Sequence, residues 1–368
     1  MIVAGVMSGT SLDGIDVAIV DLRPQRGKLR VVPIFFESTP YPNGVREALL
    51  AVSNAMTHTA TIARLHFLLG ELYADAIEKT SRRIRPDLIG LHGQTIYHEG
   101  QPIEYLGRRI ASTFQIGEAA VVAEHTGVRV ISNFRERDIA AGGQGAPLVP
   151  YADYLLFHRA QRGRAVLNIG GIANVTLLPA GVEPDGVIAF DTGPGNMVID
   201  GIVTHLTEGR EHFDRNGRIA KRAQVHEKLL AAMLGDPYFK MAPPKSTGRE
   251  RFGREFINGL VATGIGIEDL IATATEFTAR SIAIAIPPKV EVIASGGGVR
   301  NRQIMRRLGE LLPEREVVTS ATYGIDPDAK EAIAFAVLAY EFAKRRPGNL
   351  PSATGARRPV LLGKDSPA

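Results

Sequence analysis

Two segments of the sequence share one pattern, in which an apolar strand, a glycine-containing turn and a second apolar strand follow one another. The first occupies residues 2–20 around a turn at 7–16, and the second occupies residues 164–178 around a turn at 168–171. Each segment opens one half of a 368-residue chain, which is longer than a single hydrophobic core usually serves. The pattern therefore predicts an internal duplication, with two related domains in the chain.

The first turn has the composition of a phosphate-binding hairpin. Small residues let the backbone curl so that several N–H groups converge on an anion, and the hydroxyls of Ser8, Thr10 and Ser11 add donors. Two carboxylates follow, Asp13 and Asp16, which suit a phosphate site when a divalent cation is bound with the phosphates. An ordinary Gly-rich, Asp-capped hairpin is the alternative. The expected nucleotide-binding residues of this turn are Gly9, Thr10, Ser11, Leu12, Asp13, Gly14, Ile15 and Asp16.

The composition excludes several classes of protein. The formal charge is +4, but basic and acidic residues are interspersed, so nucleic acid is not implied as a partner. The chain has no cysteine, which excludes disulfides, thiol nucleophiles and thiolate metal sites. The sequence also lacks an apolar run of roughly 18 residues and an export signal at its start, so we expect a cytoplasmic protein without membrane contact.

Strands and helices are expected to alternate in both halves of the chain. Apolar and β-branched patterns predict strands at residues 2–6, 15–21, 30–36, 88–91 and 128–132, and near residues 165, 186, 290 and 316. The predicted helices include residues 60–84, 197–206, 270–285 and 329–342. The alternation predicts mixed α/β domains at residues 1–160 and 161–344. Residues 345–368 form a Pro-, Gly- and Arg-rich tail, expected to be loosely ordered or to end in a short strand.

Two further loops carry residues that suit chemistry. Gly296, Gly297 and Gly298 follow an apolar strand and precede a helix expected near residue 300, an arrangement that suits the adenosine side of a nucleotide. A plain tight turn is the alternative. Asp191 ends a predicted strand before a Gly-Pro-Gly turn, which is the usual place for a catalytic base in an α/β protein. The alternative role for Asp191 is to cap the helix that follows.

A set of short motifs, in order along nearly the whole chain, resembles the anhydro-N-acetylmuramic acid kinase family. The motifs are GVMSGTSLDG at 5–14, HGQT at 92–95, QIG at 115–117, NFRERD at 133–138, AAGGQGAPLVP at 140–150, NIGG at 168–171, FDTGPGN at 190–196 and PKSTGRE at 244–250. The family lies in the actin, sugar kinase and Hsp70 superfamily. The resemblance therefore implies two duplicated actin-like, ribonuclease H-like ATPase domains around an interdomain cleft, with Gly170 and Gly171 among the nucleotide-binding residues.

The resemblance also implies a reaction. The family uses ATP and water to open 1,6-anhydro-N-acetylmuramic acid, a product of cell-wall recycling, and to phosphorylate O6, which gives N-acetylmuramic acid 6-phosphate and ADP. Asp191 then acts as the general base that deprotonates the water attacking C1. The released O6 takes the γ-phosphoryl group, with Mg²⁺ and backbone amides neutralising charge. The metal ligands are left unassigned.

The sugar is expected to contact five residues. Glu331 corresponds to a second acid that holds the sugar, although an exposed helix charge is the alternative. Arg137 as the first candidate and Arg135 as the second suit the lactyl carboxylate of muramic acid. The alternative is that residues 135–138 form a ladder of ion pairs on the surface. His92 and Thr95 are expected in a loop after a strand, where a neutral structural histidine is equally consistent.

The resemblance further implies a homodimer, and residues 245–249 are expected to form a mobile basic loop over the site. Two rival functions stay open. One is a kinase for another anhydrosugar, such as levoglucosan. The other is a nucleotide-switched clamp without small-molecule chemistry, although a separate partner-binding domain is not evident in the sequence.

Overall fold

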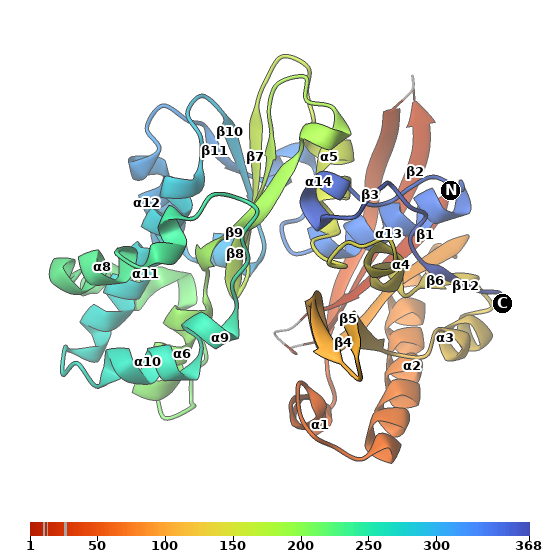
Figure 1. The fold of residues 1–368 in the computed structure, drawn as a ribbon, viewed down its shortest axis with the longest axis horizontal. Coiled ribbons are helices and arrows are strands. Elements are labelled where there is room, and N and C mark those ends of the chain that lie inside the picture. The colour runs from red at the N-terminus through yellow and green to blue at the C-terminus, as the bar shows by residue number, and fades with distance from the viewer. Residues whose placement is uncertain (10–11, 13, 26–27) are drawn as a thin grey trace. The chain divides into compact units, whose positions relative to one another are not determined.

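The computed structural model describes residues 1–9, 12, 14–25 and 28–368, and their contacts divide the chain into two compact units. Unit 1 consists of Met1–Leu156 and Ala329–Ala368, and unit 2 consists of Phe157–Asp328 (Figure 1). The first boundary lies close to the expected one at residue 160. The second does not, because the segment after residue 328 belongs with unit 1 rather than with the second half of the chain.

Unit 1 contains a seven-stranded sheet. Three antiparallel strands come first, β1 (Ile2–Ser8), β2 (Gly14–Gln25) and β3 (Lys28–Pro40), and β4 (Leu88–Tyr105) and β6 (Val130–Ser132) continue the sheet parallel to β1. The order is β3-β2-β1-β4-β6-β12, with β5 (Arg108–Ile116) paired to the outer part of β4. The last strand, β12 (Lys364–Ser366), pairs antiparallel with β6, so the tail ends in a short strand.

Unit 2 repeats the topology of unit 1. Its five strands are β7 (Arg164–Ile169), β8 (Ile172–Leu178), β9 (Ile188–Pro194), β10 (Glu291–Ser295) and β11 (Val317–Thr319). The first three are antiparallel, and β10 and β11 lie parallel to β7 in the order β9-β8-β7-β10-β11. Both units therefore place their first five shared strands in the order third, second, first, fourth, fifth. This common order confirms the duplication that the two glycine turns predicted.

The helices of the described chain lie mostly between these strands. Their bounds are α1 (Val45–Val52), α2 (Thr59–Ser81), α3 (Ala119–Thr126), α4 (Phe134–Ala140), α5 (Val149–Phe157), α6 (Met197–Leu206), α7 (Arg218–Arg222), α8 (Glu227–Leu234), α9 (Arg249–Phe252), α10 (Arg254–Val261), α11 (Ile267–Ala285), α12 (Arg302–Leu311), α13 (Lys330–Ala343) and α14 (Pro351–Thr354). Short 3-10 helices cover Pro184–Gly186, Arg215–Gly217, Pro237–Lys240, Gly297–Arg300 and Ser320–Tyr323. Within the described part of the chain, no helix has the length and hydropathy needed to span a membrane.

Helix α13 explains why the end of the chain belongs with unit 1. It packs against β1, β2 and β4, and its backbone lies so close to β1 that a Cβ on Gly5 would sit 1.8 Å from the carbonyl oxygen of Ala332. The segment after α13 is packed as well, since Val360 and Leu362 are buried. Residues 345–368 are thus not the loosely ordered tail that their composition indicated, because their apolar residues reach the core of unit 1.

Each unit has its own core. In unit 1, apolar residues of β1 and β2 meet one face of α2, whose side chains Leu65, Leu69, Tyr73 and Ile77 recur every turn. In unit 2, α11 is buried along most of its length, from Leu270 to Ile282, and packs against α6, α7, α8, α12 and β9. Burial of this much apolar surface is the main source of stability, at about 25 cal/mol for each Å² removed from water.

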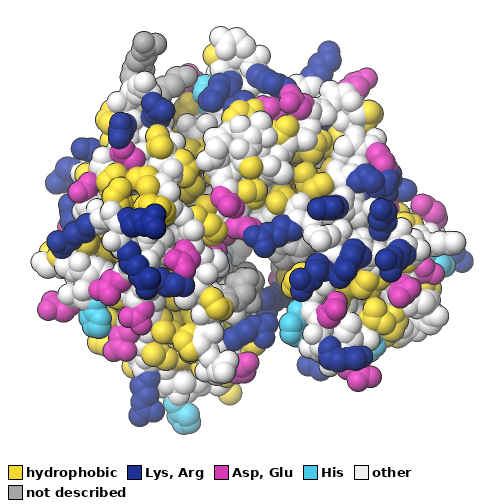
Figure 2. Space-filling view, turned by 180° about the vertical axis from the view of Figure 1, so that it is seen from behind, with side chains coloured by type: hydrophobic (Ala, Val, Ile, Leu, Met, Phe, Trp, Pro, Cys, Tyr) yellow, Lys and Arg dark blue, Asp and Glu magenta, His cyan; other side chains and the backbone are white. Residues whose placement is uncertain are grey.

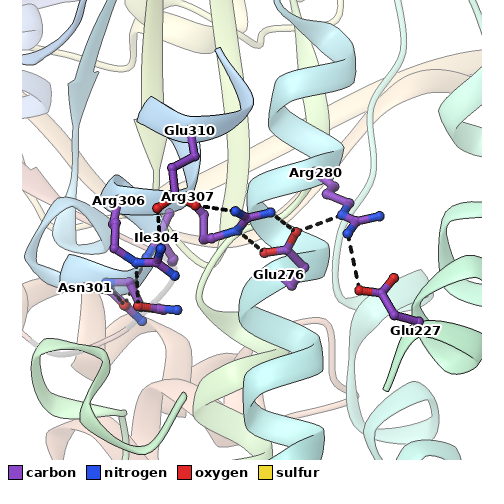
Figure 3. A network of polar contacts seen from close by, with 9 residues as sticks. Glu227, Glu276, Arg280, Asn301, Ile304, Arg306, Arg307 and Glu310 are labelled. Atoms are coloured by element: carbon purple, nitrogen blue, oxygen red, sulfur yellow. Dashed lines mark hydrogen bonds and ion pairs between the residues drawn. The ribbon is translucent and has the colours of Figure 1, made fainter. Parts of the chain in front are cut away.

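A charged network holds α12 against α11. Arg307 donates two hydrogen bonds, 2.6 and 2.7 Å, to the carboxylate of Glu276, and Arg280 donates a third of 2.7 Å (Figure 3). Arg307 also pairs with Glu310 on its own helix. This network fixes the position of α12, which begins at Arg302, shortly after the Gly296–Gly298 turn. Elsewhere on the surface, basic and acidic side chains are intermixed on the face shown in Figure 2, as the interspersed charges of the sequence predict.

Candidate active site

Buried side chains form hydrogen bonds at the start of the turn between β1 and β2. The hydroxyl of Ser8 lies 2.6 Å from that of Tyr73 and donates to the carbonyl of Gly93 at 3.0 Å. Gln94 donates to the carbonyl of Gly9 at 3.2 Å. The Ser8 hydroxyl is therefore used inside the protein, where the sequence alone indicated a donor to phosphate.

Other predicted residues of this turn have structural roles too. Leu12 adopts a left-handed conformation with φ 57°, its amide donates to Gly9 at 3.2 Å, and its side chain is buried. Gly14 approaches β3 so closely that a Cβ would lie 2.4 Å from the carbonyl of Thr39. Ile15 is buried in the core and Asp16 is half-buried on β2. The remaining predicted residues, Thr10, Ser11 and Asp13, lie outside the described residues.

His92 and Thr95 lie within β4, so the prediction of a loop there is wrong. The strand continues because Gln94 pairs with Ser8 of β1 on one side and with Ile116 of β5 on the other. The continuation of the strand past His92 was not predicted, because Gly93, at φ 79°, interrupts the apolar pattern of the sequence. The hydroxyl of Thr95 accepts a hydrogen bond of 3.2 Å from Gln115.

The half-buried Arg135 is hydrogen-bonded to the buried His92. Arg135 donates from Nε and Nη2 to His92 Nε2, at 3.1 and 2.9 Å, and from Nη1 to the carbonyl of Gly145 at 2.8 Å. Burial, followed by the charge of Arg135, holds the pKa of His92 well below its usual value. His92 is thus neutral at pH 7, with Nε2 as an acceptor and the proton on Nδ1. The alternative of a neutral structural histidine fits this geometry.

Glu331 lies in the first turn of α13 and belongs to the same electrostatic neighbourhood. Burial raises the pKa of its carboxyl, and the charges of Lys330 and Arg135 oppose that effect. Burial also lowers the pKa of Arg135 to about 10, and Glu331 is the largest influence in the other direction. The structure therefore brings three predicted sugar residues, His92, Arg135 and Glu331, together in unit 1, and Glu331 is not an exposed helix charge.

Arg137 and Asp138 exclude the surface ion-pair ladder. Arg137 is exposed on α4, while Asp138 points inward and is fully buried. The Asp138 carboxylate accepts from the Gly145 amide at 2.8 Å, from Asn349 at 2.7 Å and from Thr354 at 2.8 Å. This aspartate fastens the segment after α13 to α4, which leaves Arg137 as the accessible cation of the motif.

The two glycine turns of unit 2 pack directly on each other. A Cβ on Gly298 would lie 2.2 Å from Ile169, and one on Gly296, at φ 82°, would lie 2.6 Å from Asn168. Close packing therefore requires glycine at these two positions. The strand is followed by a 3-10 turn at Gly297–Arg300, and α12 begins only at Arg302, two residues after the expected start.

Three other glycines of these turns have space beside them. A Cβ on Gly297 would meet nothing within 4 Å, and one on Gly170 or Gly171 would make only ordinary contacts of 3.4 Å or more. The carbonyls of Gly170 and Gly171 accept from the amides of residues 195–197, at the start of α6. The packing of the chain does not require glycine at these three positions, which fits the close approach of a ligand to the backbone.

Asp191 lies within β9, which continues to Pro194 instead of ending at the aspartate. The backbone of Asn196, not Asp191, precedes the first turn of α6, so the capping alternative is wrong. One carboxylate oxygen, Oδ2, accepts from the amide of Thr247 at 2.9 Å. Burial raises the pKa of Asp191 to about 6, the Thr247 hydrogen bond acts against this, and Glu250 adds to it. Such a carboxyl is ionised at pH 7 yet basic enough to accept a proton.

Contacts from the segment around residue 245 to Asp191 were not predicted. The sequence indicated a mobile basic loop, whereas the structure shows the Asp191 amide donating to the Lys245 carbonyl at 3.1 Å. Tyr238 was also missed, although its hydroxyl donates to the Asp191 carbonyl at 2.6 Å. A tyrosine in an ordinary aromatic stretch carries no sequence signal for such a contact.

The described residues contain no group of three or more His, Cys, Asp or Glu side chains that could hold a metal ion. A dedicated protein cage for a cation is therefore not formed by them. Mg²⁺ bound mainly by phosphates and water needs only one or two carboxylates, and the half-buried Asp16 beside the β1–β2 turn fits that requirement.

Comparison with known proteins gives one consistent result. The family model described as anhydro-N-acetylmuramic acid kinase matches residues 1–368. A protein of that name from Caldanaerobacter subterraneus subsp. tengcongensis is 44% identical, with 99% of this chain and 96% of the relative covered. One from Bacillus cereus strain AH187 is 43% identical, covering 99% and 98%. Another from Salinibacter ruber is 42% identical, covering 98% and 95%.

Proposed function

Because the chain belongs to the anhydro-N-acetylmuramic acid kinase family, we propose that it converts 1,6-anhydro-N-acetylmuramic acid, water and ATP into N-acetylmuramic acid 6-phosphate and ADP. The observation that carries the chemistry is the environment of Asp191, a half-buried carboxyl whose pKa is raised to about 6 and which has one oxygen held by a backbone amide. Such a group suits a general base better than a structural acid.

In the proposed reaction, Asp191 accepts a proton from a water molecule as the water oxygen bonds to C1 of the sugar. The bond between C1 and O6 breaks in the same step, and O6 leaves with the electron pair. O6 then attacks the γ-phosphorus of ATP, and the bond to ADP breaks. The proton on Asp191 returns to solvent, so atoms and charges balance.

The glycine turns support the binding of ATP. We propose that the backbone amides of the β1–β2 turn and the hydroxyls of Thr10 and Ser11 contact the phosphates, and that Asp13 of the same turn faces the cation bound with them. The open positions Gly170, Gly171 and Gly297 would allow the nucleotide to approach the backbone of unit 2. Mg²⁺, when bound with ATP, neutralises charge on the phosphates, and Asp16 is the described carboxylate proposed to reach it.

The sugar is proposed to contact unit 1 through Glu331, Arg135, Arg137, His92 and Thr95. Arg135 already binds His92 and Gly145, so it is better suited to position His92 than to bind a further carboxylate. Arg137 is exposed and is proposed to bind the lactyl carboxylate that distinguishes muramic acid from glucose-derived anhydrosugars.

Coupled ADP release on two sugars tests this proposal. Purified protein with Mg²⁺ and ATP should release ADP with 1,6-anhydro-N-acetylmuramic acid and much more slowly with levoglucosan, which lacks the lactyl carboxylate. Arg137→Ala should raise KM for the first sugar and leave the slow reaction with the second unchanged. Faster turnover of levoglucosan would favour the rival anhydrosugar kinase, and ADP release that is independent of any sugar would favour a nucleotide-switched clamp.

We also propose that the protein is a cytoplasmic homodimer. The sequence resemblance supports the dimer, and the need for ATP supports the compartment. Sedimentation velocity at micromolar concentration checks the oligomeric state, with a mass of twice 39.6 kDa expected.

A further inference from the structure

The segment of residues 245–247 contacts Asp191 at two points. The Asp191 amide donates to the Lys245 carbonyl at 3.1 Å, and the Thr247 amide donates to Oδ2 of the Asp191 carboxylate at 2.9 Å. The first contact fixes the strand position of the aspartate, and the second fixes the orientation of its side chain. Two contacts from one short segment hold both the backbone and the carboxylate of the same residue.

The segment is itself anchored through Tyr238. The Lys245 ammonium donates to the Tyr238 carbonyl at 3.0 Å and lies 4.7 Å from the centre of its ring. The Tyr238 hydroxyl in turn donates to the Asp191 carbonyl at 2.6 Å. Each of Asp191, Lys245 and Tyr238 is thus hydrogen-bonded to the other two. The ammonium of Lys245 points toward Tyr238.

We propose that residues 245–247, anchored on Tyr238, are the positioning element of the catalytic base, because the Thr247 amide holds one oxygen of Asp191 and leaves the other to accept the proton. The inference rests on the proposed function, in which Asp191 is that base. It assigns Lys245, Thr247 and Tyr238 to the reaction as positioning residues that act through Asp191.

The charges near Asp191 agree with this role. Burial and the carboxylate of Glu250 disfavour the ionised aspartate, and the Thr247 hydrogen bond favours it. The other charged groups of this region, Lys245 and Arg251, lie over the ring of Tyr238. The Thr247 amide is therefore the contact among the described residues that offsets the cost of burying a charged base.

Thr247 offers a matched pair of variants. Its hydroxyl is buried and has no hydrogen-bond partner among the described residues, so Thr247→Ala keeps the amide and removes only the side-chain hydroxyl and methyl groups. Thr247→Pro removes the N–H that binds Asp191. Tyr238→Phe keeps the ring beneath Lys245 and removes the donor to the Asp191 carbonyl.

The test is the dependence of kcat/KM for the anhydrosugar on pH, measured on the full chain at saturating Mg²⁺ and ATP. Loss of a hydrogen bond to a charged carboxylate should move the acidic limb of Thr247→Pro upward by about one to two pH units relative to the wild type. The limb of Thr247→Ala should stay at the wild-type position. A folded Thr247→Pro protein with an unmoved limb would overturn the proposal.

Tyr238→Phe decides the question if Thr247→Pro does not fold. The expected result is a fall in kcat of roughly tenfold with KM for both substrates unchanged, since orientation of the base is lost and not binding. A kcat equal to that of the wild type would refute the positioning role. Failure of the proposed function looks different, since Asp191→Asn would then turn over at the wild-type rate.

Discussion

The ammonium of Lys330 lies 2.9 Å from a carboxylate oxygen of Asp153, and both side chains are almost completely buried. Asp153 lies in α5, the last helix of unit 1 before the chain enters unit 2, and Lys330 opens α13, the first helix after it returns. The ion pair therefore ties together, within unit 1, the two segments through which the chain leaves and re-enters this unit.

Removing one partner of this pair should be costly. Lys330→Met is expected to lower the free energy of unfolding by about 3–5 kcal/mol, because it leaves the Asp153 carboxylate buried without its cation. Urea denaturation measures the loss. The double variant Asp153→Leu/Lys330→Met should recover most of it, and a double variant less stable than Lys330→Met alone would contradict this explanation.

Asp191→Asn should lower kcat by several orders of magnitude, since an amide cannot accept the proton of the attacking water. In the wild type, activity should fall as the pH drops below about 6, because burial raises the pKa of Asp191 to about 6 and only the ionised form is a base. Initial rates of ADP release between about pH 4.5 and about pH 8 check both expectations.

Glu276→Gln should destabilise unit 2 in a way that depends on pH. Burial raises the pKa of Glu276, but hydrogen bonds from Arg307 and Arg280 outweigh it, so the pKa is lowered in the folded state. The stabilisation is therefore complete above the unfolded-state pKa and disappears as the pH falls through the folded-state value. Melting curves at pH 7 should show a loss of about 1–2 kcal/mol, and the two proteins should converge in acid. Glu310→Gln is the control, because Glu310 is exposed and pairs with the same Arg307, and this variant should lose much less stability.

Gly5→Ala should disrupt the packing of α13 on the sheet, since its Cβ would lie 1.8 Å from the carbonyl of Ala332. A loss of about 3 kcal/mol is expected for overpacking against backbone. Gly259→Ala is the matched control, because that helical position has nothing within 4 Å of a new Cβ. The control should gain about 0.5–1 kcal/mol. Equal effects of the two changes in thermal unfolding would rule out the steric explanation.

Tyr73→Phe should weaken the hydrogen bonding that holds Ser8 at the start of the proposed phosphate-binding turn. The variant loses the 2.6 Å contact with Ser8, whose hydroxyl keeps its bond to Gly93. We expect a stability loss of about 1 kcal/mol and a KM for ATP raised several-fold, with KM for the sugar unchanged. Tyr105→Phe, on the exposed end of β4, serves as the control. An effect on the sugar alone would argue against a role of this turn in binding ATP.

Local patterns predicted most of the fold. Strand β1 and helices α6 and α13 lie within a few residues of their expected bounds, because apolar periodicity is a property of neighbouring residues. Strand β5 was not predicted, since Arg108 and Arg109 and several exposed residues hide its alternation. Its pairing with β4 also turned the expected loop around His92 into a strand.

The polar contacts of the site could not be predicted in the same way. Asn349 binds Asp138, and Thr247 binds Asp191, across long separations in sequence. A hydrogen bond of this kind depends on where the whole fold brings two groups, and neither residue has a local pattern that reveals its partner. The glycine turns and Asp191 were recognisable because their composition is unusual by itself.

The discontinuity of unit 1 has a consequence for synthesis on the ribosome. The strands β1, β2 and β4 emerge early, but the helix that covers them, α13, is translated only after the whole of unit 2. Unit 2 is encoded by one uninterrupted stretch and can complete its core while the nascent chain is still growing. Unit 2 is thus expected to reach its native state before unit 1, and the apolar face of the N-terminal sheet needs protection from aggregation until α13 has been synthesised.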